Sequence, residues 1–383
     1  MSKHSSEACK KSLVQCLLAV DDPRVERTKE HLLIDILVIA ICAILCGAEH
    51  WTEMERFGKF KEAWLREFLE LPHGIPSHDT FARVFAALDS EQLRSCFAVW
   101  VKGMLSGASV GHIALDGKKL RRSGESSSGK EAIHMVSAYA HENGLVLAQR
   151  RVDDKSNEIT ALPKILKLLE LTDSIVSIDA MGCQKSIAKQ ITSQGGNYVL
   201  SLKGNQGKLA ESVEAYFVSA KRDDFALLEH DRHETVDGDH GRIESRCYDV
   251  LYEAEWLDPK KEWGGLSAVG CVYSERIVNG VTSRESRYYL LSARMPAKAF
   301  ASAVRNHWGI ENKLHWVLDM AFREDECRVR QGNSAENLAI LRHMALNLLK
   351  QDTTVKLGIK SKRKAAGWDN DYLRHLMNGN LDA

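Results

Sequence analysis

Four ionisable side chains recur at a spacing of four residues near the C-terminal end of the chain. His307, Glu311, His315 and Asp319 lie within residues 306–330, NHWGIENKLHWVLDMAFREDECRVR. In a helix this spacing places the four side chains along one face. Ionisable groups beside a buried face lose hydration free energy unless they have partners or a function. The row therefore predicts that other carboxylates of the chain meet it.

The same segment carries an apolar stripe next to the ionisable row. The stripe residues follow the i, i+4, i+7, i+8, i+11 spacing of a buried helix face; they are Ile310, Leu314, Val317, Leu318 and Ala321. We expect one amphipathic helix through the whole segment.

Two further carboxylates follow short β-like runs. Asp116 comes after 112–115 and is followed by Gly117, which we expect to end the strand; Asp179 comes after 175–178. Ligand sites of open α/β sheets lie at the carboxyl ends of strands. Two aspartates and Glu311 supply the hard oxygen ligands that suit Mg²⁺ or Mn²⁺.

Four segments together resemble a known family. LDGKKLRRS, SIDAMGCQ, YVLSLKGNQ and the 306–330 block are similar to signature blocks of DDE transposases, specifically the bacterial insertion-sequence branch of the ISAs type with the H-repeat-associated proteins. The resemblance covers nearly the whole chain, including an N-terminal associated domain around IPSHDTFARVFAALD. It implies a catalytic and metal-binding triad of Asp116, Asp179 and Glu311, a ribonuclease H-like core, and Mg²⁺- or Mn²⁺-dependent cleavage and joining of DNA ends.

One departure from related transposases concerns phosphate contacts. Many relatives carry Tyr, Arg and Lys at minus seven, minus four and plus seven from the glutamate, where this chain has Val304, His307 and Leu318. The resemblance therefore does not assign the basic residues that contact phosphate.

Candidates for DNA contact are basic, polar and aromatic side chains near the three carboxylates. A basic cluster beside a metal-type carboxylate is better explained by a phosphate backbone than by solvation alone. The candidates are Lys118, Lys119, Arg121, Arg122, Lys203, His307, Trp308, Asn312 and His315. Several of them have an alternative role. The histidines could be buried with satisfied hydrogen bonds, Trp308 could pack against the apolar stripe, and Lys203 could be a solvated surface residue.

Composition limits the other function classes. The formal net charge is zero, so any DNA affinity must come from local basic patches. Nine cysteines occur without a CxxC pair, and no HExxH motif is present, which disfavours a zinc protein or metalloprotease. The cysteines, the absence of an apolar signal core, and the shortness of the apolar run 32–48 favour a cytoplasmic, nucleoid-associated protein.

The order of predicted elements indicates an α/β fold. Residues 10–108 are predicted to form a helical transposase-associated domain. Residues 109–350 are predicted to form a ribonuclease H-like catalytic domain, in which helices flank a mixed sheet and a β-rich insertion occupies about 210–296. Residues 351–383 are predicted to form a basic tail. Strands are expected at 111–116, 132–140, 145–152, 174–179 and 197–202, with helices at 159–171 and 183–194. In this fold the first and fourth strands are neighbours, which would bring Asp116 and Asp179 together.

The N-terminal region offers two interpretations. Ser77 is a plausible N-cap for a helix over 77–88 that follows a Pro/Gly turn, so the region either reads DNA as a helix-turn-helix or packs as a plain helical bundle. The resemblance implies a transposase that acts as a homo-oligomer on double-stranded DNA, both the terminal inverted repeats of its element and the target DNA. The alternatives are a catalytically silent, domesticated DNA-binding protein and a ribonuclease H-like nuclease without end joining.

Overall fold

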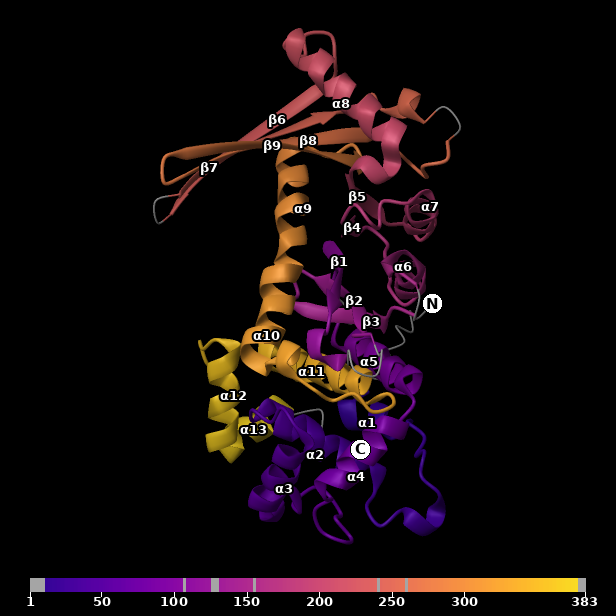
Figure 1. Ribbon diagram of the computed structural model, residues 1–383, viewed down its shortest axis with the longest axis vertical. Helices are drawn as coiled ribbons and strands as arrows, with labels where there is room; N and C mark the ends of the chain where they lie inside the picture. Colours follow the sequence, from indigo (N-terminus) through magenta and orange to yellow (C-terminus); the bar gives the residue numbers. More distant parts are fainter. Residues whose placement is uncertain are drawn as a thin grey trace, which may run out of the picture.

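The computed structural model describes residues 11–105, 108–124, 131–153, 156–239, 242–258 and 261–377. The molecule is elongated (Figure 1): helices from both ends of the sequence form its base, an α/β core lies in the middle, and a twisted β-arm lies at the opposite end. The helix α9 runs from the arm to the base along the core.

The core is a five-stranded unit with the predicted order of elements. Strands β1, β4 and β5 are parallel, β2 pairs antiparallel with β1, and β3 pairs antiparallel with β2. The elements are β1 (His112–Lys119), β2 (His134–Ala140), β3 (Leu145–Arg151), α6 (Glu158–Leu166), β4 (Ile175–Ile178), α7 (Lys185–Ser193) and β5 (Asn197–Leu202). The spatial order β3-β2-β1-β4-β5 is that of a ribonuclease H-like fold, and the predicted neighbourhood of the first and fourth strands is confirmed.

The first strand continues beyond the expected end. Gly117 was expected to terminate it, but β1 runs to Lys119 and pairs with β2 as far as Lys119 opposite His134. The prediction was wrong because a hydrogen-bonded partner strand holds the glycine in extended backbone. Asp116 therefore lies within β1, and only the parallel pairing with β4 ends before it.

The insertion extends the core sheet. It contains α8 (Gly207–Arg222), β6 (His230–Asp239), β7 (Arg242–Leu251), β8 (Ala268–Val278) and β9 (Val281–Leu291). Strand β9 pairs antiparallel with β5, so that one nine-stranded sheet runs in the order β3-β2-β1-β4-β5-β9-β8-β7-β6. The β-rich character was expected, but β6 was missed because HDRHETVDGD shows no apolar alternation and the strand lies at the edge of the sheet.

The helix predicted over 306–330 contains a π-helical turn and ends before residue 330. Its helical path begins earlier, in α9 (Ala297–Ile310), passes through a π-helical turn at Glu311–His315, and ends with α10 (Trp316–Phe322). Arg323 then adopts a left-handed conformation with φ of 49°, which stops the helix. The expectation of a continuous helix to residue 330 was therefore wrong.

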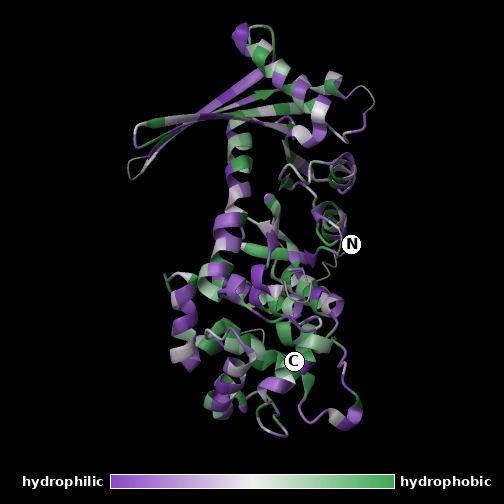
Figure 2. Ribbon diagram, viewed as in Figure 1, coloured by the Kyte–Doolittle hydropathy of each residue, from purple (hydrophilic) through white to green (hydrophobic). Residues whose placement is uncertain are grey.

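The base joins the two ends of the sequence. Helix α11 is buried along most of its length and packs against α2, α4, α5 and β3. The helices are α1 (Leu13–Leu17), α2 (Leu33–Leu45), α3 (Trp51–Leu65), α4 (His78–Ala87), α5 (Ser90–Met104), α11 (Ser334–Gln351), α12 (Ile359–Trp368) and α13 (Asn370–Met377), and short 3-10 turns occur at Glu26–Thr28, Arg121–Ser123, Gly204–Gln206, Glu255–Leu257 and Glu324–Glu326. One hydrophobic core is continuous from Leu13 to Met377, across the sequence boundary expected near residue 108. In Figure 2 hydrophobic residues lie mainly on the inner helices of the base, whereas its outer helix α12 and the arm strand β6 are largely hydrophilic.

Two residues of the C-terminal basic segment are buried. Within the described part of 351–383, the ammonium of Lys362 donates to the carbonyl of Leu349 at 3.0 Å, and the guanidinium of Arg363 donates to that of Ile44 at 2.9 Å. Both side chains are buried. They serve helix packing, whereas 378–383 lie outside the described residues.

The apolar run 32–48 forms α2, which is 13 residues long and buried from Asp35 to Leu45. The carboxylate of Asp35 accepts a hydrogen bond from the backbone of Leu71 at 3.0 Å, so this charge has a partner inside the base. None of the helices in the described part of the chain has the length and apolar character that a membrane span requires.

Candidate active site

Strand register brings the two aspartates to adjacent positions. The last parallel pair of β1 and β4 is Leu115 opposite Ile178, so Asp116 and Asp179 occupy the next position on each strand. They therefore lie at the carboxyl edge of the parallel strands, where α/β sheets build their ligand sites.

Glu311 reaches this edge from a distant part of the sequence. Helix α9 packs across β1, β4 and β5 and ends one residue before Glu311. Asp116, Asp179 and Glu311 line one cavity of about 220 Å³. Glu311 also begins the π-helical turn, and such turns are often found at functional sites because they change the direction of side chains within a helix.

The carboxylates of the cavity influence one another. Burial, followed by the charges of Glu158, Asp179 and Glu311, raises the pKa of Asp116 to about 7. Burial also raises the pKa of Asp179, although Asp179 Oδ1 accepts hydrogen bonds from the backbone of Met181 at 3.1 Å and of Gly182 at 3.2 Å. Negative charge is thus concentrated here, as in a cation site.

Glu158 belongs to this cluster and was missed by sequence reasoning. It begins α6, is 8% exposed, and its carboxylate lies 2.9 Å from Nε2 of His134. A side chain at Gly117 would collide with it, since a Cβ there would lie 2.2 Å from Glu158 Oε1. The sequence signal was weak because an acidic residue in a first helical turn is common.

The two histidines of the row take different partners. His307 Nδ1 lies 3.0 Å from the hydroxyl of Ser177, and burial lowers the His307 pKa to about 4. His315 Nδ1 lies 3.5 Å from Asp116 Oδ2, and burial lowers the His315 pKa to about 3. Both imidazoles are therefore neutral at pH 7, and His315 borders Asp116 without adding positive charge.

Lys118, a candidate for DNA contact, faces inward. Its ammonium lies 2.5 Å from Asp319 and 2.8 Å from Glu324, and its side chain is 11% exposed. These ion pairs also account for Asp319, the fourth member of the row. A structural role explains Lys118 better than a phosphate contact.

The remaining DNA-contact candidates are accessible to solvent or line cavities. Lys119, Arg121 and Arg122 are exposed, although Arg121 Nε lies 3.1 Å from Asp325. Lys203, His307 and Trp308 line the cavity of the three carboxylates, whereas Asn312 lines a neighbouring cavity.

The donor set fits a hard divalent cation in chemical type. Carboxylate oxygens on neighbouring strands and a facing helix match the ligands of Mg²⁺ and Mn²⁺. In the part of the chain that the structure describes, no three His, Cys, Asp or Glu residues are grouped closely enough to hold a metal ion. The cavity therefore supplies the ligand types around a common space, not a preformed coordination shell.

Family comparisons agree with this geometry. The model of the transposase DDE domain matches residues 108–348, and that of the DDE_Tnp_1-associated domain matches residues 14–101. The chain belongs to the DDE transposase family.

Relatives of this family member match it over nearly its whole length. It is 39% identical to the "H repeat-associated putative transposase YhhI" of Escherichia coli (strain K12), over 96% of this chain and 98% of the relative. It is 40% identical to the "Putative transposase YncI" of Escherichia coli O157:H7, over 96% and 94%. A piggyBac transposase synaptic complex with hairpin DNA aligns over 97% of this chain and 79% of that chain, at 9% identity and a TM-score of 0.46.

Proposed function

We propose that this DDE transposase family member cuts and joins the ends of an insertion sequence at the cavity of Asp116, Asp179 and Glu311. The observation that supports this most is their convergence: strand register pairs the aspartates, and α9 brings the glutamate to the same cavity. Its proposed partner is double-stranded DNA, both the element's inverted repeats and the target, bound by a homo-oligomer associated with the nucleoid.

Asp116, Asp179 and Glu311 would be the residues that hold the divalent cations. Bound Mg²⁺ or Mn²⁺ would supply activation of the attacking oxygen and stabilisation of the leaving 3′ oxygen. The backbone amides of Met181 and Gly182 hold Asp179 in place, and neutral His315 packs beside Asp116.

The protein's contribution to the reaction is positioning. Lys203 and Trp308 line the cavity and are proposed to contact the DNA strand that enters it. Exposed Lys119, Arg121 and Arg122 follow Asp116 and are proposed to contact phosphates. In end joining, a 3′ hydroxyl replaces water as the nucleophile at the same carboxylates.

The test uses Asp116→Asn, Asp179→Asn and Glu311→Gln with labelled duplexes that carry the element's ends and with Mg²⁺. We expect each variant to lose about a thousandfold in cleavage rate, roughly 4 kcal/mol of transition-state stabilisation. Glu170→Gln is the matched control, because Glu170 is exposed and pairs with Lys102 on the surface at 3.4 Å.

Three other results would change the proposal. Cleavage without joined products by the unaltered protein would indicate a nuclease, and DNA binding without cleavage would indicate a silent, domesticated protein. Retained cleavage in all three variants would refute the site. Short inverted repeats flanking the gene would support a mobile element.

A further inference from the structure

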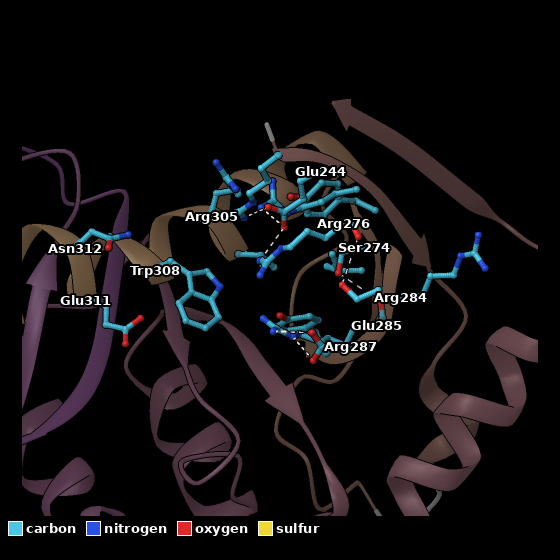
Figure 3. Close-up of a pocket in the computed structure, with 18 of the residues that line it drawn as sticks. Glu244, Ser274, Arg276, Arg284, Glu285, Arg287, Arg305, Trp308, Glu311 and Asn312 are labelled. Atoms are coloured by element: carbon cyan, nitrogen blue, oxygen red, sulfur yellow. Dashed lines mark hydrogen bonds and ion pairs between the residues drawn. The ribbon is translucent and has the colours of Figure 1, made fainter. Parts of the chain in front are cut away.

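A large cavity lies in the angle between α9 and the β-arm (Figure 3). Its volume is about 770 Å³, and seven cationic but only three anionic side chains line it. Two more carboxylates, Asp237 and Glu275, pair with lining arginines. Even with these counted, seven positive charges face five negative ones, in a chain whose formal net charge is zero.

Most of the charged side chains share one face of the arm, whereas Arg284, opposite Glu275 of β8, lies on the other face. Successive side chains of a strand alternate between its faces, so Arg242, Glu244 and Arg246 of β7 point the same way. On β8 the residue opposite Glu244 is Arg276, which continues the row across the sheet. We call five of the lining arginines the arginine groove: Arg242, Arg246, Arg276, Arg287 and Arg305.

One buried carboxylate organises the centre of the groove. Glu244 is 4% exposed and lies 2.5 Å from Arg246 and 3.4 Å from Arg276, and it also pairs with Arg242. Three guanidinium groups around one carboxylate are held in place, while their total charge still exceeds that of their partner. Guanidinium groups fixed in this way suit bidentate binding of phosphate.

The outer half of the arm is largely exposed in the described residues. The first six residues of β9, from Val281, are exposed, and the outer end of β8 is largely exposed too, whereas the hydrophobic cluster around Phe300 covers only the inner ends of the strands. Internal packing therefore does not explain the charged outer strands. A polyanion across this face would supply the missing partner.

The groove leads directly to the carboxylates. Arg287, Trp308 and Glu311 line both this cavity and the cavity of the two aspartates. Figure 3 shows Trp308 and Glu311 on the helix facing the arginines of the arm. A DNA backbone in the groove would thus enter the site proposed above.

We propose that the arginine groove binds the sugar-phosphate backbone of the DNA duplex beside the phosphate to be cut. This inference rests on the proposed function for its location, because the groove opens onto the carboxylates. The recognition is by charge and so independent of base sequence.

The experiment compares two fourfold variants with equal charge change. The groove variant combines Arg242→Gln, Arg276→Gln, Arg287→Gln and Arg305→Gln; the control combines Arg27→Gln, Arg66→Gln, Arg222→Gln and Arg374→Gln at exposed positions outside the groove. Affinity for a fluorescent duplex is measured by anisotropy between about 50 and 200 mM salt, in EDTA so that no cleavage occurs.

We expect the groove variant to lose at least about tenfold in affinity and its slope of log K against log salt to become shallower by about 3 to 4, because each phosphate contact contributes about 0.9. The control should keep the slope of the unaltered protein. A matching Arg→Lys variant of the four groove positions should keep most of the slope, which separates charge from misfolding.

An unchanged slope in the groove variant, or an equal loss in the control, would overturn the inference. The result is independent of catalysis. If the carboxylate variants still cleave DNA but the groove result holds, the proposed active site fails and the groove stands; if only the groove result fails, the active site stands.

Discussion

The two adjoining cavities gather opposite charges by different structural means. The carboxylate cavity lies at the edge of the core sheet, where burial and like charges raise the pKa of Asp116 to about 7. The arginine groove lies on an exposed arm, where ion pairs to Glu244 and Asp237 hold the cations. Burying like charges requires a rigid fold, whereas an exposed ribbon can carry them at little cost in stability.

This difference has a consequence for substitution. Carboxylate positions depend on strand register and on helix packing, so changes around them should affect folding or the chemical step. Changes in the groove should affect DNA affinity and its salt dependence while the fold persists.

The largest effect on stability is expected at Lys118. Unlike the more exposed arginines of the groove, this cation is largely buried and paired with carboxylates. Lys118→Met leaves Asp319 and Glu324, the latter 2% exposed, without their ammonium partner. Breaking a buried ion pair in this way costs about 3–5 kcal/mol of unfolding free energy. Urea unfolding measures it, and Lys119→Met, at an exposed neighbour, should stay within about 0.5 kcal/mol. Equal stability of the two variants would show that Lys118 resembles the groove cations.

Glu158→Gln tests how far the carboxylate cavity extends. The amide keeps the shape beside His134 but removes a charge that lies close to Asp116. We expect cleavage to fall about 10–100-fold and the Mg²⁺ concentration for half-maximal rate to rise, as for residues that support metal ligands. DNA affinity in EDTA should not change. An unaltered Mg²⁺ requirement would exclude Glu158 from the cation site.

The core fold was predictable because its signals are local. Short apolar runs and helical periodicity gave the order of elements. In the ribonuclease H-like fold that this order indicates, the first and fourth strands are neighbours, and hence Asp116 and Asp179 are adjacent. Strand β6 was not predictable in this way, because a charged edge strand buries neither face and shows no alternation.

The surroundings of the site depend on contacts between distant segments. Glu158 looks like an ordinary surface charge in sequence and Lys118 like one of a basic cluster. Only the packing of α6 against β2 and the approach of Asp319 and Glu324 to Lys118 give them their partners. The π-helical turn at Glu311 leaves no mark in the apolar spacing.

Trp308 lies at the boundary between the two cavities and tests whether one strand passes through both. Its side chain is 44% exposed, and the guanidinium of Arg287 lies 5.4 Å from its ring centre. If a base stacks there, Trp308→Ala should weaken binding of cleaved ends with a single-stranded extension by about 1–3 kcal/mol. Trp308→Phe should restore much of it, and Trp368→Ala, at an exposed tryptophan of α12, should have no effect. Equal binding by the Ala and Phe variants would assign Trp308 to packing.

The smallest effect is expected at Arg83. It tests whether α4 recognises base sequence, whereas the arginine groove is proposed to recognise charge alone. Helix α4 is capped by Ser77, whose hydroxyl accepts from the Thr80 backbone at 3.3 Å, as predicted. Phe81 and Phe85 are buried in the base, and Arg83 remains exposed on the other side of the helix.

If α4 reads a major groove, Arg83→Ala should lower affinity for the element's own ends by about 1 kcal/mol and leave random duplexes unaffected, since base contacts carry the sequence information. The arginine-groove variant should weaken both DNAs equally. Competition between end-bearing and random duplexes at fixed salt measures the difference. Equal losses for both DNAs would make Arg83 a phosphate contact, and no loss would leave α4 as a packing helix of the base.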